Sequence, residues 1–408
     1  MMIWLFALVL FGCVAYVGFA MGAIRASASL LGLLVASLLA PALGHIFNPL
    51  VSAVGVKSPL LVWVLGPFIA FIVVLAVFKI IGHAVHRKVD VYYKYKAGDL
   101  RMGLFNRLNA RVGIAVGVMN AAVYLILISW VVYVFSYATT QVESGDTAPW
   151  AVRMLNSAGE SLQSSGMAKV SAAVDKMPQS YYQAADTLGL IYHNDLLEAR
   201  LSRYPAFLAL AERPEFQEIG NDKDFAELRQ KQPPITEILD NPKAQNIVNN
   251  PGLLNEIWTT TTPHLTDLQA YLKTGQSAEY AGEKILGRWD FDQNGPLNAV
   301  KRAKPNIGVL EMQRTKQTLS QIFAKTTLVA TPAPDKLAFM KDYGKLRPGA
   351  TPKLPPTVET QSFKGTWTGD TGKYGISFPD AGKDLQAVVD GDRLTVTGDF
   401  YPLVFSRE

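Results

Sequence analysis

The chain has 408 residues, a mean hydropathy of +0.14 and a formal net charge of +5. It is too long for one ordinary domain and too apolar for a plain soluble protein. Residues 1–136 hold ten Lys and Arg against two Asp and Glu, whereas the remainder holds 29 against 32. The positive charge thus belongs to the apolar third of the chain, which argues against a nucleic-acid-binding surface, and we expect no nucleic-acid partner.

Four apolar runs fill this first third, over residues 2–23, 27–47, 60–81 and 112–137. About 20 helical residues, at 1.5 Å each, cross roughly 30 Å of hydrocarbon. The first run lacks the cationic start of a signal peptide, because no Lys or Arg precedes Arg25, and we expect it to be retained. The sequence therefore predicts a four-helix transmembrane domain over residues 1–138.

Basic residues between the third and fourth runs predict the sidedness of these helices. Short loops rich in Lys and Arg stay on the cytoplasmic face, so both the N-terminus and everything after residue 137 are expected outside the cytoplasm. Trp4, Trp63 and Trp130 fall at the predicted outer boundary, where aromatic rings prefer to lie. The topology-setting residues are Arg25, Arg87, Lys88, Lys94, Lys96, Arg101, Arg107 and Arg111.

Small residues recur every four positions along several of the runs. Such stripes allow helices to approach closely in lipid, and we expect them to pack the bundle and to support a homo-oligomer. Asn120 is the clearly polar residue inside the fourth run; it is either a functional group or an amide that hydrogen-bonds across a helix interface, and we expect the second role. The helix-packing residues are Gly18, Gly22, Gly32, Ala36, Gly113 and Gly117.

Two motifs in these helices resemble a known family. Gly18-x-x-x-Gly22-x-x-Arg25 precedes a small-residue helix, and Leu104-Phe105-Asn106-Arg107-Leu108 runs into Gly113-x-x-x-Gly117. Residues 1–140 thereby resemble the colicin V production (CvpA) family. The resemblance implies a multi-pass protein of the bacterial inner membrane, linked to toxin production or export and to envelope homeostasis. An acidic residue expected near the start of the first helix is absent, since that stretch reads Ile3-Trp4-Leu5-Phe6.

Residues 139–330 have a soluble composition and predict a mainly helical extracytoplasmic domain. Polar residues repeatedly precede Pro there, as at Asn241-Pro242 and Asn250-Pro251, which is the pattern of a helix N-cap followed by Pro at the first helical position. These units resemble the Asn/Asp-Pro repeats of stress-inducible co-chaperones, which implies an apolar groove for a client helix near residues 216–254. The alternative, which we expect, is a compact domain of Pro-capped helices.

The remaining residues predict a linker followed by strands. Residues 331–361 are rich in Pro and indicate a linker, and residues 362–408 predict a small antiparallel β-meander. Gly365-Thr366-Trp367 resembles the start of the first strand of some lipocalin-like barrels, but about 45 residues are too few to close a barrel. Because Gly287-Arg288-Trp289 repeats this motif, we expect its strand to join the same sheet.

Catalytic and cofactor motifs are not recognisable in the sequence, so we predict no enzyme, no cofactor and no catalytic or metal-binding residue. Asp290-x-Asp292-x-Asn294-Gly295 matches the opening of a calcium loop, but Lys301 stands where the bidentate Glu belongs, which favours a polar turn. His83, His86 and Asp90 could share a helical face, but Arg87 and Lys88 flank them and repel cations.

The predicted function is therefore that of a scaffold or interaction protein. A transmembrane module would reside in the lipid bilayer of the inner membrane and present its outer domain to an unidentified envelope protein. A channel or exporter component is one alternative, motivated by the family's link to toxin release. A peptide-binding outer domain that uses the Pro-capped helices is the other.

Overall fold

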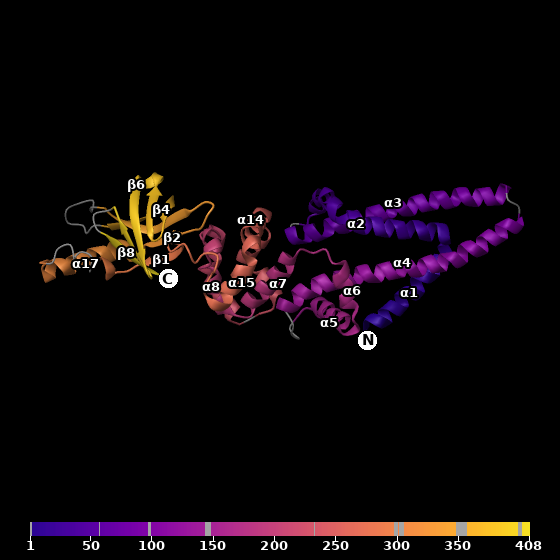
Figure 1. Ribbon diagram of the computed structural model, residues 1–408, viewed down its shortest axis with the longest axis horizontal. Coiled ribbons are helices and arrows are strands. Elements are labelled where there is room, and N and C mark those ends of the chain that lie inside the picture. The colour runs from indigo at the N-terminus through magenta and orange to yellow at the C-terminus, as the bar shows by residue number, and fades with distance from the viewer. Residues whose placement is uncertain are drawn as a thin grey trace. The chain divides into compact units, whose positions relative to one another are not determined.

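The structure, a computed structural model, describes residues 2–56, 58–96, 99–142, 148–231, 233–297, 301, 306–347, 357–398 and 402–408. It forms two compact units (Figure 1). The first comprises Met1–Gly189 and Lys231–Leu254, and the second comprises Leu190–Gln230 and Asn255–Glu408. The unit that holds the long apolar helices therefore continues about fifty residues beyond the predicted boundary at residue 138.

Four long helices dominate the first unit: α1 (Met2–Met21), α2 (Ala23–Ala53), α3 (Pro59–Lys96) and α4 (Asp99–Val142). Each is long and apolar enough to cross a membrane, and each contains one predicted apolar run. Helix α1 packs on α4, α4 on α2, and α2 on α3. At 1.5 Å per residue, α3 and α4 are about 57 and 66 Å long, roughly twice the thickness of a hydrocarbon layer.

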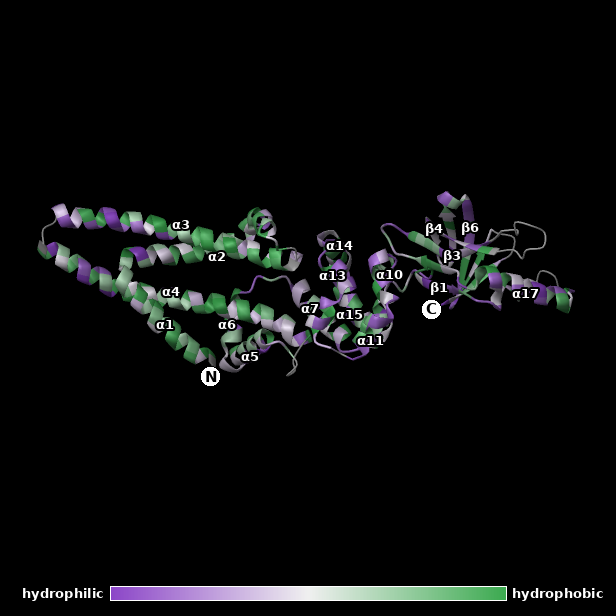
Figure 2. Cartoon of the chain, turned by 180° about the vertical axis from the view of Figure 1, so that it is seen from behind, coloured by the Kyte–Doolittle hydropathy of each residue, from purple (hydrophilic) through white to green (hydrophobic). Residues whose placement is uncertain are grey.

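The predicted basic loop is largely helical. Helix α3 continues to Lys96 and α4 already begins at Asp99, so the basic residues lie on two helical extensions, which are hydrophilic at the end of the α3–α4 pair in Figure 2. The rings of Tyr93 and Phe105 stack at 4.4 Å between their centroids and hold the two extensions together. Because α3 runs from Pro59 to Lys96, it includes His83 and His86, and the expectation that they lie on a helix is confirmed.

Three shorter helices pack on the first unit's long helices: α5 (Trp150–Ser165), α6 (Met167–Val174) and the first turns of α7 (Gln179–Tyr192). The indole of Trp130 donates to Asp175 Oδ1 at 2.8 Å, and the hydroxyl of Tyr181 donates to the carbonyl of Val134 at 3.0 Å. Trp130, expected at the outer lipid boundary, therefore has a protein partner. These bonds fix the segment after α6 to the end of α4.

Short helices follow, and their starts agree with the capping pattern. Asn241 Oδ1 accepts from the backbone N–H of Lys243 at 2.9 Å, and Asn250 Oδ1 accepts from Leu253 at 3.1 Å, which confirms two predicted N-caps. Because α10 and α11 belong to the second unit whereas α12 and α13 belong to the first, no single unit contains the predicted groove. The helices are α8 (Asp195–Leu201), α9 (Leu208–Ala211), α10 (Pro214–Gly220), α11 (Lys223–Gln230), α12 (Ile235–Asp240), α13 (Pro242–Val248), α14 (Pro251–Thr261) and α15 (Leu265–Thr274).

The second unit ends in a closed antiparallel β-barrel, in which each strand pairs with the next and β8 pairs back with β1. Helix α17 (Val309–Phe323) follows β1, and Figure 1 shows it beside the barrel. The strands are β1 (Gly287–Phe291), β2 (Thr327–Ala330), β3 (Leu337–Arg347), β4 (Thr357–Asp370), β5 (Lys373–Phe378), β6 (Lys383–Asp390), β7 (Arg393–Thr397) and β8 (Leu403–Arg407).

The prediction of a small open meander over residues 362–408 was wrong. The barrel closes because the predicted strand at Trp289 joins it as β1, together with β2 from the stretch expected to be helical and β3 from the stretch expected to be a linker. Gly287-x-Trp289 begins the first strand, whereas Gly365-x-Trp367 lies in β4. The expectation that both motifs share one sheet is confirmed.

Side chains fill the interior of the barrel. Trp289, Trp367, Phe378 and Phe405 are buried there in one continuous core, to which α17 adds Phe323. Both indoles are satisfied, since Trp289 Nε1 donates to the Ile285 carbonyl and Trp367 Nε1 to the Thr331 carbonyl, each at 2.8 Å. The interior of the barrel is thus a packed hydrophobic core.

Candidate functional site

The first unit contains a cavity among its long helices, with a volume of about 70 Å³ and a mainly apolar lining that includes four polar residues. Its polar lining comes from Ser29 on α2, Lys79 on α3, and Asn120 and Tyr124 on α4. Val14, Val17, Gly18 and Met21 of α1 form its apolar side, together with Ala26 and Gly117. All four long helices therefore contribute to one site.

Asn120 bridges two helices at this cavity. Its side chain is only 5% exposed, and its Nδ2 donates to the carbonyl of Ala26 at 3.1 Å. This bond joins α4 to the first turn of α2 and places the amide one residue from Arg25. The predicted hydrogen bond across a helix interface is present. The other amide atom, Oδ1, is buried at the cavity without a partner in the described part of the chain, as is Ser29 Oγ.

The helix-packing glycines lie at close backbone contacts within one chain. A Cβ atom on Gly113 would lie 2.3 Å from the Gly18 carbonyl oxygen, and one on Gly117 would lie 2.8 Å from the Val14 carbonyl oxygen. Gly22, with φ of +78°, turns the chain between α1 and α2 against Asn109. On the other pair, Gly32 faces Phe78 of α3, and Ala36 is fully buried. The stripes thus serve contacts between helices of the same chain.

The topology-setting residues lie together at one end of the bundle. Arg25 begins α2, and its Nε donates to the Met21 carbonyl at 2.6 Å, at the edge of the cavity. Arg87, Lys88, Lys94 and Lys96 belong to the extension of α3, and Arg101, Arg107 and Arg111 to that of α4. The end of the bundle nearest the cavity is therefore strongly basic.

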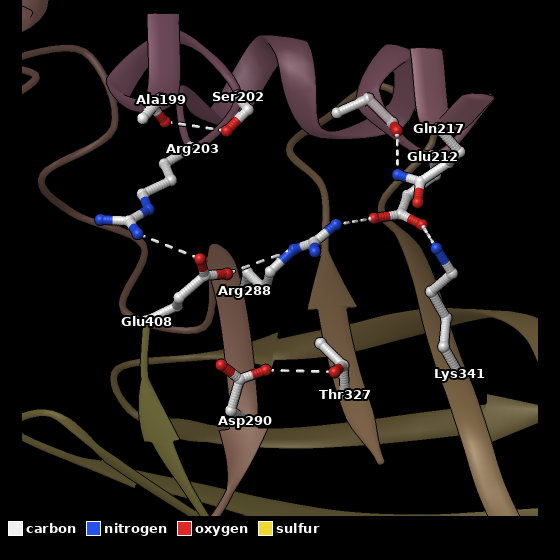
Figure 3. Close-up of polar contacts among 11 residues, drawn as sticks. Ala199, Ser202, Arg203, Glu212, Gln217, Arg288, Asp290, Thr327, Lys341 and Glu408 are labelled. Carbon is white, nitrogen blue, oxygen red and sulfur yellow. Dashed lines mark hydrogen bonds and ion pairs between the residues drawn. The ribbon is translucent and has the colours of Figure 1, made fainter. Parts of the chain in front are cut away.

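A second set of charges joins the barrel to the segment around α9 (Figure 3). Glu212 follows α9, and its side chain is only 4% exposed between Arg288 of β1 and Lys341 of β3. Its Oε2 lies 2.5 Å from Lys341 Nζ, and its Oε1 accepts from Arg288. Glu408 extends the chain of charges, with Arg288 Nε at 3.5 Å and Arg203 Nη2 at 3.0 Å. These contacts couple the residue after α9 to two strands of the barrel, β1 and β3.

Ser277, His264 and Asp267 are the residue types of a hydrolase triad, but here their contacts stabilise the fold. Ser277 Oγ donates to Asp267, whereas His264 Nδ1 lies 2.7 Å from Glu279 Oε1. Serine and histidine therefore have separate partners, so they do not form the nucleophile–base pair that acyl transfer requires. Tyr204 completes the cluster by donating to Asp267 Oδ2 at 2.9 Å. The arrangement fixes α15 and the loop after it.

Asp267 makes the stability of this loop dependent on pH. Burial raises its pKa, but hydrogen bonds from Ser277, Glu279, Tyr204 and Ala278 outweigh burial and hold the pKa below the usual 3.8. A lowered pKa in the folded state stabilises the fold above the unfolded-state value, and that stabilisation is lost as pH falls through the folded-state value.

We expect Asp267→Asn to loosen residues 277–280 at neutral pH. The hydrogen bonds to a charged carboxylate weaken, and hydrogen exchange of the Ala278 and Glu279 amides should accelerate on the order of tenfold, or about 1.4 kcal/mol. Lowering the pH below 4 should bring the wild type toward the variant, after correction for intrinsic exchange. Asp384→Asn, at an exposed position of β6, is the control; equal protection in all three proteins would contradict the assignment.

Within the described residues, no group of three or more His, Cys, Asp or Glu side chains is arranged to hold a metal ion. Asp292 Oδ1 accepts from the Asn294 backbone N–H at 2.9 Å, as in a polar turn. Lys301 is described without its flanking residues, so the remainder of the predicted calcium-loop match lies outside the described part of the chain.

Comparison with known proteins adds little to this picture. No family model and no curated protein matches the chain. Among solved structures, fatty-acid-binding protein 1 of Echinococcus granulosus is similar, at 16% identity, over 30% of this chain and 97% of that chain, with a TM-score of 0.16. A likeness of this strength carries no argument about function.

Sequence reasoning missed three polar residues of the cavity. Tyr124 lies four residues after Asn120 on the same face of α4, and this spacing was a usable signal. Ser29 is a small polar residue in a run of small residues, and only the three-dimensional contacts distinguish it. Lys79 lies at the basic end of α3, and its place in the lining follows only from the three-dimensional structure.

Proposed function

We propose that this chain is a multi-pass membrane protein that acts as a scaffold and presents its second unit to a protein partner in the bacterial envelope. The observation that carries the proposal is the set of four long apolar helices joined through backbone-to-backbone glycine contacts. Such contacts are what helix association in lipid requires, because lipid supplies no hydrophobic drive. The basic extensions of α3 and α4 then face the cytoplasm, and the second unit lies outside it.

The second unit supports a role in interaction rather than chemistry. Buried side chains occupy its barrel interior, and Glu212 forms ion pairs with Arg288 of β1 and Lys341 of β3. Glu212 holds barrel and helices in one arrangement, which provides a preorganised surface for a partner. The resemblance to the CvpA family extends the proposal to an inner-membrane role in toxin production and envelope homeostasis.

A labelling experiment in intact cells tests the topology. In a Cys13→Ser background, we would place one cysteine at Asp390, in the exposed turn after β6, and in a matched variant at Lys96, at the end of α3. An impermeant maleimide should label Asp390→Cys in cells with a permeable outer layer and Lys96→Cys only after the inner membrane is opened. The reverse pattern would contradict the proposal.

A second experiment tests the scaffold role itself. Photo-crosslinkers placed on exposed residues of β6, such as Gln386, should capture the same envelope protein repeatedly from living cells. Crosslinkers at exposed positions of α3 that face lipid, such as Val77, should not capture it. Identical products from both positions, or none from the barrel, would count against a specific partner.

A further inference from the structure

The cavity among the long helices contains polar groups that have no role in a scaffold. Asn120 Oδ1 and Ser29 Oγ line it from different helices, both are more than nine-tenths buried, and both lack a partner among the described residues. A buried polar atom without a hydrogen bond is costly, so the two atoms together indicate a polar occupant. Because the amide nitrogen is already bound to Ala26, the free amide oxygen requires a donor.

Positive charge at the cavity favours a negatively charged occupant. Lys79 of α3 lines it and is the one charged side chain among its lining residues. Arg25 adds a second cation at the edge, since it is bound to the carbonyl of Met21, another lining residue. The occupant therefore combines an anionic group for the basic side with a hydrogen-bond donor for Asn120.

The size of the cavity and its access from outside the bundle further restrict the ligands that it could bind. A volume of about 70 Å³ holds about five water molecules, which suits a phosphate with a short polar substituent rather than a large metabolite. The cavity is bounded by α1 on one side and by Lys79 of α3 on the other, and two of its lining residues, Val17 and Lys79, are exposed. The cavity therefore reaches the surface of the bundle, which faces the lipid in a bilayer.

We propose that this cavity binds the headgroup of an anionic phospholipid from the leaflet on the basic side of the bundle. The phosphate lies against Lys79, and a headgroup hydroxyl donates to Asn120 Oδ1 beside Ser29. Basic pockets between transmembrane helices on the cytoplasmic side suit such headgroups. The inference rests on the proposed function, because it requires the bundle to lie in a bilayer.

Native mass spectrometry of the full-length protein tests this. The chain is placed in nanodiscs of equal parts phosphatidylglycerol, which has both groups, and phosphatidylcholine, which lacks the donor and the net negative charge. We expect phosphatidylglycerol to be retained on the order of tenfold more than phosphatidylcholine. Ser29→Ala and Lys79→Gln should each reduce this preference by about fivefold, the effect of one lost hydrogen bond.

Matched controls separate the cavity from general basicity. Ser37→Ala removes a hydroxyl of α2 that is bonded to the Leu34 carbonyl, and Lys88→Gln removes an exposed charge of α3, so both should retain the wild-type preference. Asn120→Leu would fill the cavity but also break the bond to Ala26, so Ser29→Ala is the primary variant because it disturbs the packing least.

Each outcome decides between explanations. Equal retention of phosphatidylglycerol by the cavity variants, the controls and the wild type would overturn the inference. Displacement of the lipid by inorganic phosphate or glycerol phosphate alone would show that the site takes a free anion, which overturns the lipid assignment. A chain that fails to enter nanodiscs would instead refute the proposed membrane function, whereas one that enters without lipid preference would refute this inference alone.

Discussion

Replacing Gly113 or Gly117 with Leu should separate α1 from α4 and destabilise the bundle by more than about 3 kcal/mol, beyond the usual cost of overpacking. The reason is that the clashing atoms are backbone: a Cβ on Gly113 meets the Gly18 carbonyl at 2.3 Å, and one on Gly117 meets the Val14 carbonyl at 2.8 Å. Backbone cannot rotate away as a side chain does. Thermal unfolding in detergent, followed by circular dichroism, would measure the loss.

The same helices supply controls for this experiment. Gly12 on α1 and Gly103 on α4 have no atom within 4 Å of the position that a Cβ would occupy, so Gly12→Leu and Gly103→Leu should be tolerated. A normal melting temperature for Gly113→Leu, with a change only in oligomer size, would show that the glycine face meets a second copy instead. That result would restore the oligomer interface expected from the sequence.

Replacing Glu212 with Gln should be the most damaging single change in the second unit's charge network. It leaves Arg288 and Lys341 facing a neutral amide in a site where the Glu212 side chain is 4% exposed. The variant loses charge-assisted hydrogen bonds at a buried carboxylate, which costs about 1.5–3 kcal/mol, while Arg288 and Lys341, each about 30% exposed, keep access to water and Arg288 keeps Glu408. Denaturant unfolding of the full chain, followed by hydrogen exchange of β1 and β3, would detect it.

Glu215→Gln is the matched comparison. Glu215 also pairs with an arginine, Arg213, at 3.4 Å, but on the surface of α10, where ion pairs contribute about 1 kcal/mol or less. Arg288→Met combined with Glu212→Leu should recover part of the loss, since an apolar pair avoids the desolvation of charge. If Glu212→Gln behaved like Glu215→Gln, the network would not be what holds α9 to the barrel.

The helices could be predicted from the sequence because their signals are local. A run of about twenty apolar residues, an Asn before a Pro, or glycines four apart each act within a single helix, and helices lie at each of these places. The closed barrel could not be predicted in the same way, because some of its strands pair with strands that are far away in the sequence. β1 stands alone between a helical stretch and α17, so nothing near Trp289 reveals that its neighbours are β2 and β8.

The cavity shows the same limit at the level of single residues. Asn120 could be singled out because an amide is unusual in an apolar run. Its partner, the carbonyl of Ala26, and its neighbour Ser29 follow from how α2 crosses α4, which no spacing in the sequence encodes. Gly22 was expected only as a packing residue, whereas its positive φ also turns the chain from α1 into α2.

The pairing of β8 with β1 has a consequence for how the chain matures. Ser406 and the Asp290 carbonyl that it contacts are 116 residues apart, so the first strand emerges long before its final neighbour has been synthesised. Until then β1 keeps one edge without its partner, and such edges readily join other chains. We therefore expect the newly synthesised chain to rely on a holding chaperone, and a stop codon placed before Leu403 to send it to proteolysis.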